Sequence, residues 1–281
     1  MGLKRTATRQ IERMRAANEL VAAVLTDLRK AIRPGVSTGE LDARAEATIV
    51  GAGATPAFKG YHGYPATLCV SINDEVIHGI PSQKRLLVEG DIVSVDVGAV
   101  LDGFVGDSAV TFPVGAVSER AALLLRVTQE SLYRAILAVK PGGRVSDIGY
   151  AVQRHVEANG CSVVREFVGH GIGTAMHEEP QVPNYGPPGR GPRLAEGMVL
   201  AIEPMVNLGR PAVRVLDDGW TAVTRDHSLS AHFEHTVAVA EEGPYVLTAR
   251  GDERFDAVLA PAGLAASDGV ETRWRKRTRL K

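Results

Sequence analysis

The sequence predicts an α+β fold built from two similar halves, each with two helices followed by strands. Amphipathic helical segments come in pairs, over about residues 8–32 and 38–53 and again over 118–139 and 145–158. Runs of β-branched and apolar residues of strand length follow each pair. Landmarks in the two halves also recur at one constant spacing. Together these three observations indicate a duplicated fold with a pseudo-twofold axis.

The recurring landmarks are residues that end helices or turn the chain, and they lie 107 positions apart. The matching pairs are Pro34 and Pro141, Gly53 and Gly160, and Glu89-Gly90 and Glu196-Gly197. Six residues after the last pair of glycines comes a carboxylate, Asp96 in the first half and Glu203 in the second. These two side chains are therefore expected at equivalent positions, where they could meet at the interface between the halves.

Cap and stop residues bound the predicted helices. A Pro-Gly step ends both the first and the third helix, and Ser37 or Thr38 caps the second. Ser118 caps the third helix in the same way. The helices are therefore predicted from local signals as well as from periodicity.

Residues 90–112 form the most informative strand region. Two apolar strands meet at Asp102-Gly103, a dipeptide favoured in two-residue hairpin turns. In that register Asp96 faces Ala109, and Asp107 lies diagonal to Asp96 on the same face. Buried carboxylates need a partner, which a metal cation would supply. By itself the stretch also fits two solvated aspartates.

The other predicted segments are short. They are a loop over 58–65, strands at 68–72 and up to 78–81, a surface loop over 184–193, a hairpin over 213–223, and a buried strand over 233–240. From about residue 251 the chain loses periodicity, and residues 273–281 hold six Lys or Arg, which indicates a solvated basic tail.

Three further residues complete a candidate metal site. His170 lies between glycines with its ring expected to be exposed, Glu203 ends an apolar strand, and Glu234 is expected inside one. With the two aspartates they carry a formal charge of −4, which two divalent cations would neutralise. Oxygen ligands with one nitrogen suit Mn, Fe, Co or Zn. The alternatives are four unrelated buried acids and a structural histidine.

Composition narrows the class of protein. The 281 residues, 44% of them hydrophobic, suffice for one large domain or two fused halves. A net charge of −1 points to neither DNA nor a membrane as a partner. Two cysteines, Cys69 and Cys161, are too few for a disulfide framework, and no apolar signal segment is evident, so we expect a cytoplasmic protein.

At the level of motifs, the chain resembles the type I methionine aminopeptidases, which have the pita-bread fold, over about residues 8–248. The motifs are Gly60-Tyr61-His62-Gly63-Tyr64-Pro65, Ser71-Ile72-Asn73, His78-Gly79-Ile80-Pro81, Gly169-His170-Gly171-Ile172-Gly173, His177-Glu178-Glu179-Pro180, Ile202-Glu203-Pro204 and Phe233-Glu234-His235-Thr236. The resemblance implies a curved antiparallel sheet covered by helices, in one catalytic domain over 1–250 with halves at 8–115 and 116–248. Residues 251–281 would be a flexible basic tail.

The resemblance also assigns site residues. Its metal ligands correspond to Asp96, Asp107, His170, Glu203 and Glu234. It places His78 near the scissile amide nitrogen and His177 near the carbonyl oxygen. For the mechanism that follows, Glu203 is our candidate proton shuttle to the leaving amine, with help from His78. The methionine pocket corresponds to Tyr61, Tyr64, Cys69 and Trp220, with Phe58 where some members have cysteine and Met176 where many have phenylalanine. Backbone oxygens of Asn73 and Ser230 match positions that hold a monovalent cation, Na⁺ or K⁺, in relatives.

The implied activity is removal of the N-terminal methionine from nascent proteins and peptides, with a small second residue preferred. A monomer is expected, and the basic tail could contact the ribosome. A prolidase or aminopeptidase P is the nearest alternative, although those enzymes usually carry an extra N-terminal domain. The type II enzymes carry an insertion between the last two ligands, whereas here 31 positions separate Glu203 from Glu234. A non-enzymatic binding protein of the same fold is the third alternative.

Overall fold

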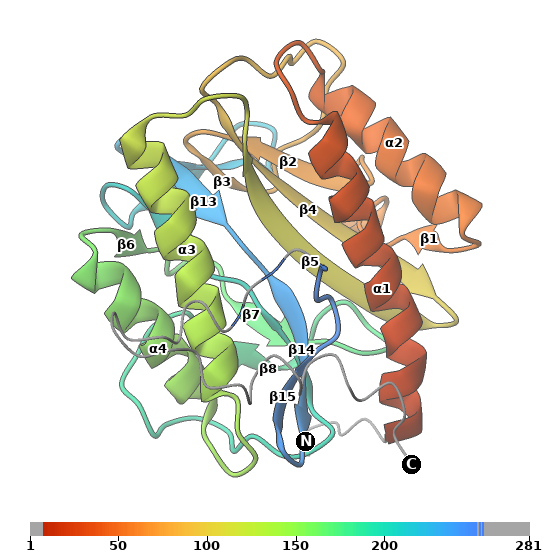
Figure 1. The fold of residues 1–281 in the computed structure, drawn as a ribbon, viewed down its shortest axis with the longest axis vertical. Coiled ribbons are helices and arrows are strands. Elements are labelled where there is room, and N and C mark those ends of the chain that lie inside the picture. The colour runs from red at the N-terminus through yellow and green to blue at the C-terminus, as the bar shows by residue number, and fades with distance from the viewer. Residues whose placement is uncertain (1–7, 252, 254, 256–281) are drawn as a thin grey trace.

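The computed structural model describes residues 8–251, 253 and 255, and in each of two similar halves a pair of α-helices precedes the strands (Figure 1). The helical elements are α1 (Thr8–Ala31), α2 (Thr38–Gly51), the 3₁₀ turn η1 (Tyr61–Gly63), α3 (Glu119–Ala138) and α4 (Val145–Ala158). The strands of the first half are β1 (Thr55–Pro56), β2 (Leu68–Ile72), β3 (Glu75–Ile77), β4 (Ile92–Leu101) and β5 (Phe104–Pro113). Those of the second half are β6 (Ser162–Val163), β7 (Gly169–Gly171), β8 (Glu178–Val182), β9 (Val199–Ile202), β10 (Met205–Asn207), β11 (Val213–Val215), β12 (Ala222–Thr224), β13 (Ser230–His232), β14 (His235–Ala240) and β15 (Gly243–Val246).

The predicted duplication is confirmed in the backbone. Both ends of α2 and α4 lie 107 residues apart, as does the pair of isolated bridges Ser37↔Leu86 and Arg144↔Arg193. The short strand β1 pairs β4 and β6 pairs β10 at registers with the same offset. In Figure 1 α1 and α2 flank the strands on one side and α3 and α4 on the other. The two halves are therefore two copies of one unit.

All strand pairs between these elements are antiparallel. In the first half β1, β2 and β5 pair around β4, and in the second the order is β15-β14-β9-β7-β8. Two three-stranded sheets, β13-β10-β6 and β11-β12-β3, complete the arrangement. The strands β4 and β5 are long, with ten residues each. The stretch of the second half that corresponds to β4 is divided into β9 and β10 by Glu203-Pro204, because proline cannot donate a hydrogen bond to a neighbouring strand.

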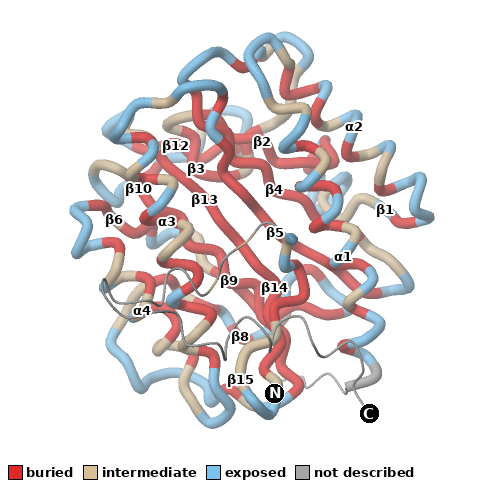
Figure 2. Tube along the Cα trace, viewed as in Figure 1, coloured by how far each residue is buried: buried red, intermediate tan, exposed pale blue. Residues whose placement is uncertain are grey.

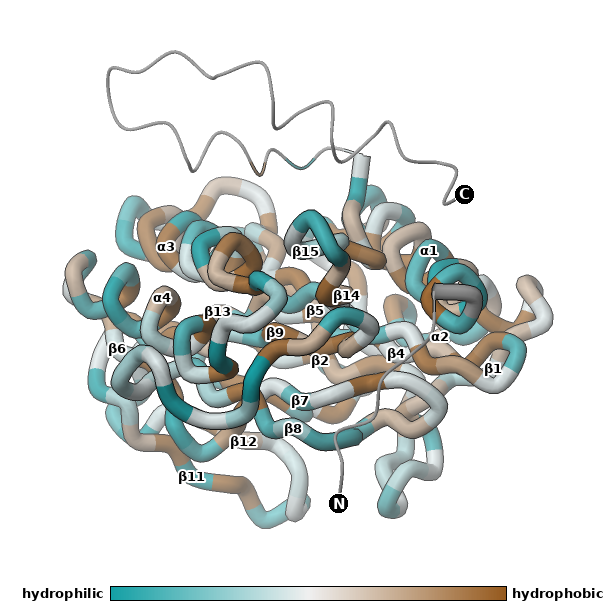
Figure 3. The backbone as a smooth tube through the Cα atoms, turned by 90° about the horizontal axis from the view of Figure 1, so that it is seen from below, coloured by the Kyte–Doolittle hydropathy of each residue, from teal (hydrophilic) through white to brown (hydrophobic). Residues whose placement is uncertain are grey.

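One apolar core joins the helices to the strands. Leu25 and Leu28 of α1, Leu132 of α3 and Val95 of β4 belong to the same buried cluster. Buried positions follow the strands, while exposed ones gather at the periphery (Figure 2). Seen from below, α1 and α3 lie over the strands, and β11 and β12 lie on the opposite side (Figure 3). The helices therefore cover one side of the layer of strands, and the site lies on the other side.

Close contact between α1 and β5 depends on Gly106. A Cβ at that position would lie 2.6 Å from the carbonyl oxygen of Ala17. The missing side chain therefore lets the first helix pack directly on the strand that carries Asp107.

Two predicted segments differ from the structure. The predicted surface loop over 184–193 is exposed or half-buried except at its first residue, Asn184, which is fully buried and donates its side-chain N–H to the carbonyl oxygen of Glu203. In the predicted tail, Glu253 and Phe255 pack on the domain, where Phe255 lies 4.6 Å from the ring of Tyr133. Residues 256–281 lie outside the described residues. Within the described part of the chain, none of the helices is both long and apolar enough to span a bilayer.

Candidate metal centre

The β4–β5 hairpin places Asp96 and Asp107 as the sequence predicts. Asp96 pairs with Ala109, and Asp107 pairs with Gly98. The turn residues Asp102 and Gly103 have φ of 52° and 76°, the left-handed values of a type I′ turn. Both acidic side chains are buried.

His170 and Glu203 reach the same region from β7 and from the end of β9. The Nε2 atom of His170 lies 3.5 Å from Oε1 of Glu203 and 3.9 Å from Oδ2 of Asp107. The predicted exposed ring is wrong: His170 is 8% exposed. The flanking Gly169 and Gly171 let backbone of neighbouring strands approach closely, which encloses the imidazole.

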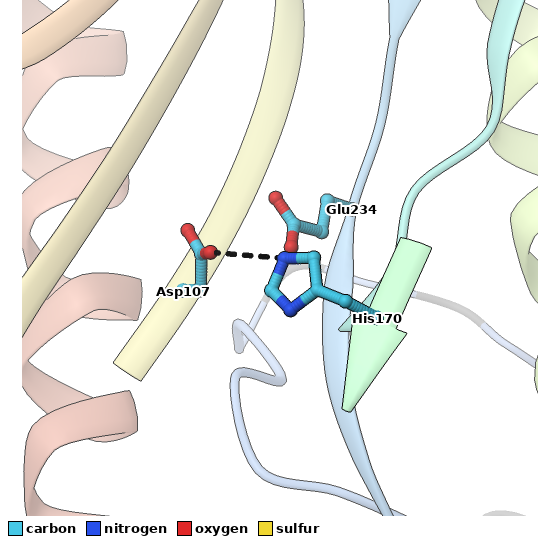
Figure 4. A group of neighbouring side chains, drawn as sticks. All are labelled: Asp107, His170 and Glu234. Carbon is cyan, nitrogen blue, oxygen red and sulfur yellow. Dashed lines mark ion pairs between the residues drawn. The ribbon is translucent and has the colours of Figure 1, made fainter. Parts of the chain in front are cut away.

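Glu234 completes the group from the break between β13 and β14. The prediction that it lies inside a strand is wrong, because Phe233 and Glu234 interrupt the pairing there. Its backbone N–H instead donates to the carbonyl oxygen of Ala109, at 2.9 Å. Ligand atoms of Asp107, His170 and Glu234 all lie within 4.8 Å of one another (Figure 4).

Burial controls the charge of these groups. It raises the pKa of Asp96 to about 7 and raises the pKa values of Asp107, Glu203 and Glu234 well above their usual range, with the neighbouring carboxylates adding to the effect. Burial, and next His177, lowers the pKa of His170 to about 4, so the imidazole is neutral near pH 7.

These residues fit divalent metal ions. Among the described residues, Oδ1 of Asp96, Oδ1 of Asp107 and Oε1 of Glu234 are buried without a hydrogen-bond partner. Nδ1 of His170 lies 2.9 Å from the carbonyl oxygen of Gly171, which leaves Nε2 directed at the carboxylates. Buried carboxylate oxygens without a hydrogen-bond partner, beside a neutral imidazole nitrogen, are the ligand atoms that a divalent cation requires.

A cavity of about 240 Å³ opens next to the carboxylates. All the predicted pocket residues line it: Phe58, Tyr61, Tyr64, Cys69, His78, Met176, His177 and Trp220. Ile77 and His62 also line it and were not predicted. A Cβ on Gly98 would lie 2.6 Å from Phe58 and 2.9 Å from Met176, so both side chains pack over this glycine.

The two accessory histidines differ in their surroundings. Nδ1 of His177 lies 2.8 Å from the hydroxyl of Tyr61, and its ring lies 4.3 Å from that of His170. His78 has a left-handed φ of 62° and packs edge-on against Phe167. Burial, with a contribution from His177, lowers the pKa of His78 to about 4. Burial also lowers the pKa of His177, so both imidazoles are able to act as neutral hydrogen-bonding groups.

Sequence reasoning missed His232. This side chain is 1% exposed, and its Nε2 atom lies 3.8 Å from Oε2 of Glu203; within the described chain that nitrogen has no hydrogen-bond partner. Its position two residues before Glu234 in a strand-like stretch was the available signal, because alternate strand residues share a face.

The predicted cation residues do come together: the N–H of Ser230 donates to the carbonyl oxygen of Asn73, at 2.8 Å.

A two-halved α+β fold in which buried carboxylates and the imidazole of His170 converge beside a cavity defines a class of metal-dependent enzymes. The model of Metallopeptidase family M24 matches residues 12–241, and the chain belongs to this family. It is thus a metallopeptidase-type hydrolase. Within the family it belongs to the type I methionine aminopeptidases, as the sequence predicts.

Several relatives support this placement. The chain is 54% identical over 239 residues to a methionine aminopeptidase of Clostridium acetobutylicum, covering 85% of this chain and 96% of that protein. It is 53% identical over 240 residues to methionine aminopeptidase 1 of Bacillus subtilis, again covering 85% and 96%. The crystal structure of a methionine aminopeptidase from Thermotoga maritima matches with a TM-score of 0.87 at 48% identity, covering 88% of this chain and 99% of that one.

The predicted prolidase alternative shares the fold. A prolidase from Pyrococcus furiosus matches with a TM-score of 0.69 at 24% identity, and the match covers 89% of this chain but 66% of that one. That likeness concerns the fold alone.

Proposed function

We propose that this chain removes the amino-terminal methionine of peptides and nascent proteins at the cavity beside Asp96 and Asp107, with a preference for a small second residue. The observation that carries the proposal is the convergence of four buried carboxylates and a neutral imidazole on a cavity walled by aromatic and sulfur-bearing side chains. Sulfur and aromatic faces attract each other, which suits a thioether substrate side chain.

Five side chains would hold two divalent ions: Asp96, Asp107, His170, Glu203 and Glu234. Mn, Fe, Co and Zn all suit this donor set. When bound, such ions supply a water activated near neutral pH and polarise a carbonyl oxygen. The acidic site would also attract the free amino group of the substrate, which explains action at the chain end.

Residues that line the cavity bind the peptide, and Glu203 also moves a proton. His177, oriented by the Tyr61 hydroxyl 2.8 Å away, donates to the carbonyl oxygen as negative charge develops on it. Glu203 takes the proton from the attacking water and passes it to the leaving amine, and His78 contacts the scissile nitrogen. Phe58, Tyr64, Cys69, Met176 and Trp220 enclose the methionine side chain.

A monovalent cation, Na⁺ or K⁺, is proposed at the backbone oxygens of Asn73 and Ser230. Their adjacency supports the proposal. A shift in the midpoint of thermal unfolding with added KCl or NaCl, beyond that seen with choline chloride, is expected. Equal midpoints in the three salts would contradict it.

The enzyme is proposed to act as a cytoplasmic monomer, with nascent chains among its substrates. Both cysteines are free and buried, which suits a reducing compartment. Ribosome contact through the basic residues 273–281 predicts that deletion of 265–281 reduces co-sedimentation with ribosomes. Unchanged co-sedimentation would contradict that contact.

The reaction is tested with metal-stripped enzyme, adding back Mn²⁺, Fe²⁺, Co²⁺ or Zn²⁺ separately. We expect metal-dependent release of methionine from Met-Gly-Met-Met and much slower release from Met-Leu-Met-Met. Cleavage of a Xaa-Pro peptide alone would assign the enzyme to the prolidase branch. Tight metal binding without any turnover would favour a binding protein.

A further inference from the structure

Two buried polar residues lie directly behind two of the metal ligands. Ser108 follows Asp107 in β5, and His235 follows Glu234 at the start of β14. Because successive strand side chains point to opposite faces, these neighbours project away from the metal centre. Both are 0% exposed, so their polar atoms need partners inside the protein.

Side-chain hydrogen bonds tie the two ligand-bearing segments together. The hydroxyl of Ser108 donates to the carbonyl oxygen of Glu234 at 2.6 Å. In return, the hydroxyl of Thr236 donates to the carbonyl oxygen of Asp107 at 2.8 Å. The backbone carbonyls of two proposed ligands are therefore held by hydroxyls of the opposite strand.

Arg250 and Glu253, which follow β15 in the chain, form a buried ion pair. This pair contacts Ser108 and His235 on the side away from the proposed metal centre. One carboxylate oxygen of Glu253 lies 2.6 Å from Nη2 of Arg250, 2.9 Å from Nε2 of His235 and 3.2 Å from the Tyr133 hydroxyl. The other accepts the backbone N–H of Arg250 at 2.7 Å, and Nη1 of Arg250 reaches the Ser108 hydroxyl at 3.3 Å. The side chains of Arg250 and Glu253 are only 7% and 5% exposed.

We infer that Arg250 and Glu253 are positioning residues of the metal centre, which set the separation of Asp107 and Glu234 through Ser108 and His235. Arg250 and Glu253 thus belong to the working site, although neither is a proposed ligand and neither lines the cavity. The inference rests on the ligand set of the proposed function. Partners behind metal ligands typically change metal affinity or activity by roughly 10–100-fold.

The test uses the full chain and the variants Glu253→Gln and Arg250→Lys. Glu253→Gln keeps the shape but removes the charge, and Arg250→Lys keeps the charge but lacks the fork that reaches Ser108 and Glu253 together. Ile49→Val, a fully buried change in α2, is the control for lost stability alone. Calorimetric titration with Co²⁺, the midpoint of thermal unfolding and the steady-state constants for Met-Gly-Met-Met are measured for each.

We expect a loss of Co²⁺ affinity of roughly tenfold or more in Glu253→Gln, a smaller loss in Arg250→Lys, and wild-type affinity in Ile49→Val. At saturating Co²⁺ the activity of the two variants should still be lower than that of the wild type, through a lower kcat with little change in KM. Wild-type affinity in every variant that folds would overturn the inference and leave the proposed function intact. Wild-type protein that binds no Co²⁺ would instead overturn the ligand set itself.

Discussion

Asp96→Asn should stabilise the chelator-treated protein while abolishing tight metal binding. Asp96 is buried beside Asp107 and Glu203, and after burial its charge is the next cause that raises the pKa values of both. Asparagine has nearly the same shape and carries no charge. The prediction follows because buried carboxylates lower the free energy of unfolding when no cation neutralises their charge.

The magnitude follows from the pKa of Asp96, which burial raises from 3.8 to about 7. Between these values the native chain holds a proton that the unfolded chain has released, so the free energy of unfolding falls as pH rises through this window. At 1.36 kcal/mol per pKa unit, the full penalty above pH 7 is about 4 kcal/mol. The advantage of asparagine should therefore grow by about 2–3 kcal/mol between pH 5 and pH 8.

Urea denaturation in the presence of EDTA at both pH values measures this effect. Asp27→Asn is the matched control, because Asp27 pairs with Arg44 at the surface, where hydrogen bonding lowers its pKa, and it stays ionised from pH 5 to 8. A stability difference for Asp96→Asn that is the same at pH 5 and pH 8 would refute the reasoning. So would Co²⁺ affinity equal to that of the wild type.

Three further substitutions test the pocket, the chemistry and the packing. Gly98→Ala places a Cβ against Phe58 and Met176, so KM for Met-Gly-Met-Met should rise roughly tenfold, and an unchanged KM would contradict the described pocket wall. His177→Ala should lower kcat by roughly 10²-fold with Co²⁺ affinity preserved, and a pure KM effect in steady-state kinetics would argue against oxyanion stabilisation. Gly106→Ala should lower the free energy of unfolding by about 1–3 kcal/mol in urea, because its Cβ would meet backbone of α1; full stability would mean that α1 shifts without cost.

Much of the fold could be predicted because its signals are local or repeated. Cap and stop residues bounded the helices, and the Asp102-Gly103 turn set the register that places Asp96 opposite Ala109. The spacing of 107 residues relates Asp96 to Glu203 from the sequence alone, without any contact between the halves.

The predictions from sequence fail where residues from distant segments of the chain determine the surroundings of a side chain. The glycines beside His170 indicated an open ring, but they admit neighbouring backbone that buries it. Glu234 reads as a strand residue, yet its N–H bonds to β5 rather than continuing a single strand. The alternation with Glu234 was a signal for His232, but its approach to Glu203 appears only in the folded chain, as does the pairing of Glu253 with His235.

The central claim is that the five proposed ligands hold the metal on which methionine release depends. The measurement that tests it most directly is kcat/KM for Met-Gly-Met-Met as Co²⁺ is titrated into metal-stripped wild type and Glu234→Gln. We expect activity in the wild type to rise from background and saturate, and the variant to stay near background across the same range. Full activity of the stripped wild type without metal, or an identical titration curve for Glu234→Gln, would contradict the claim.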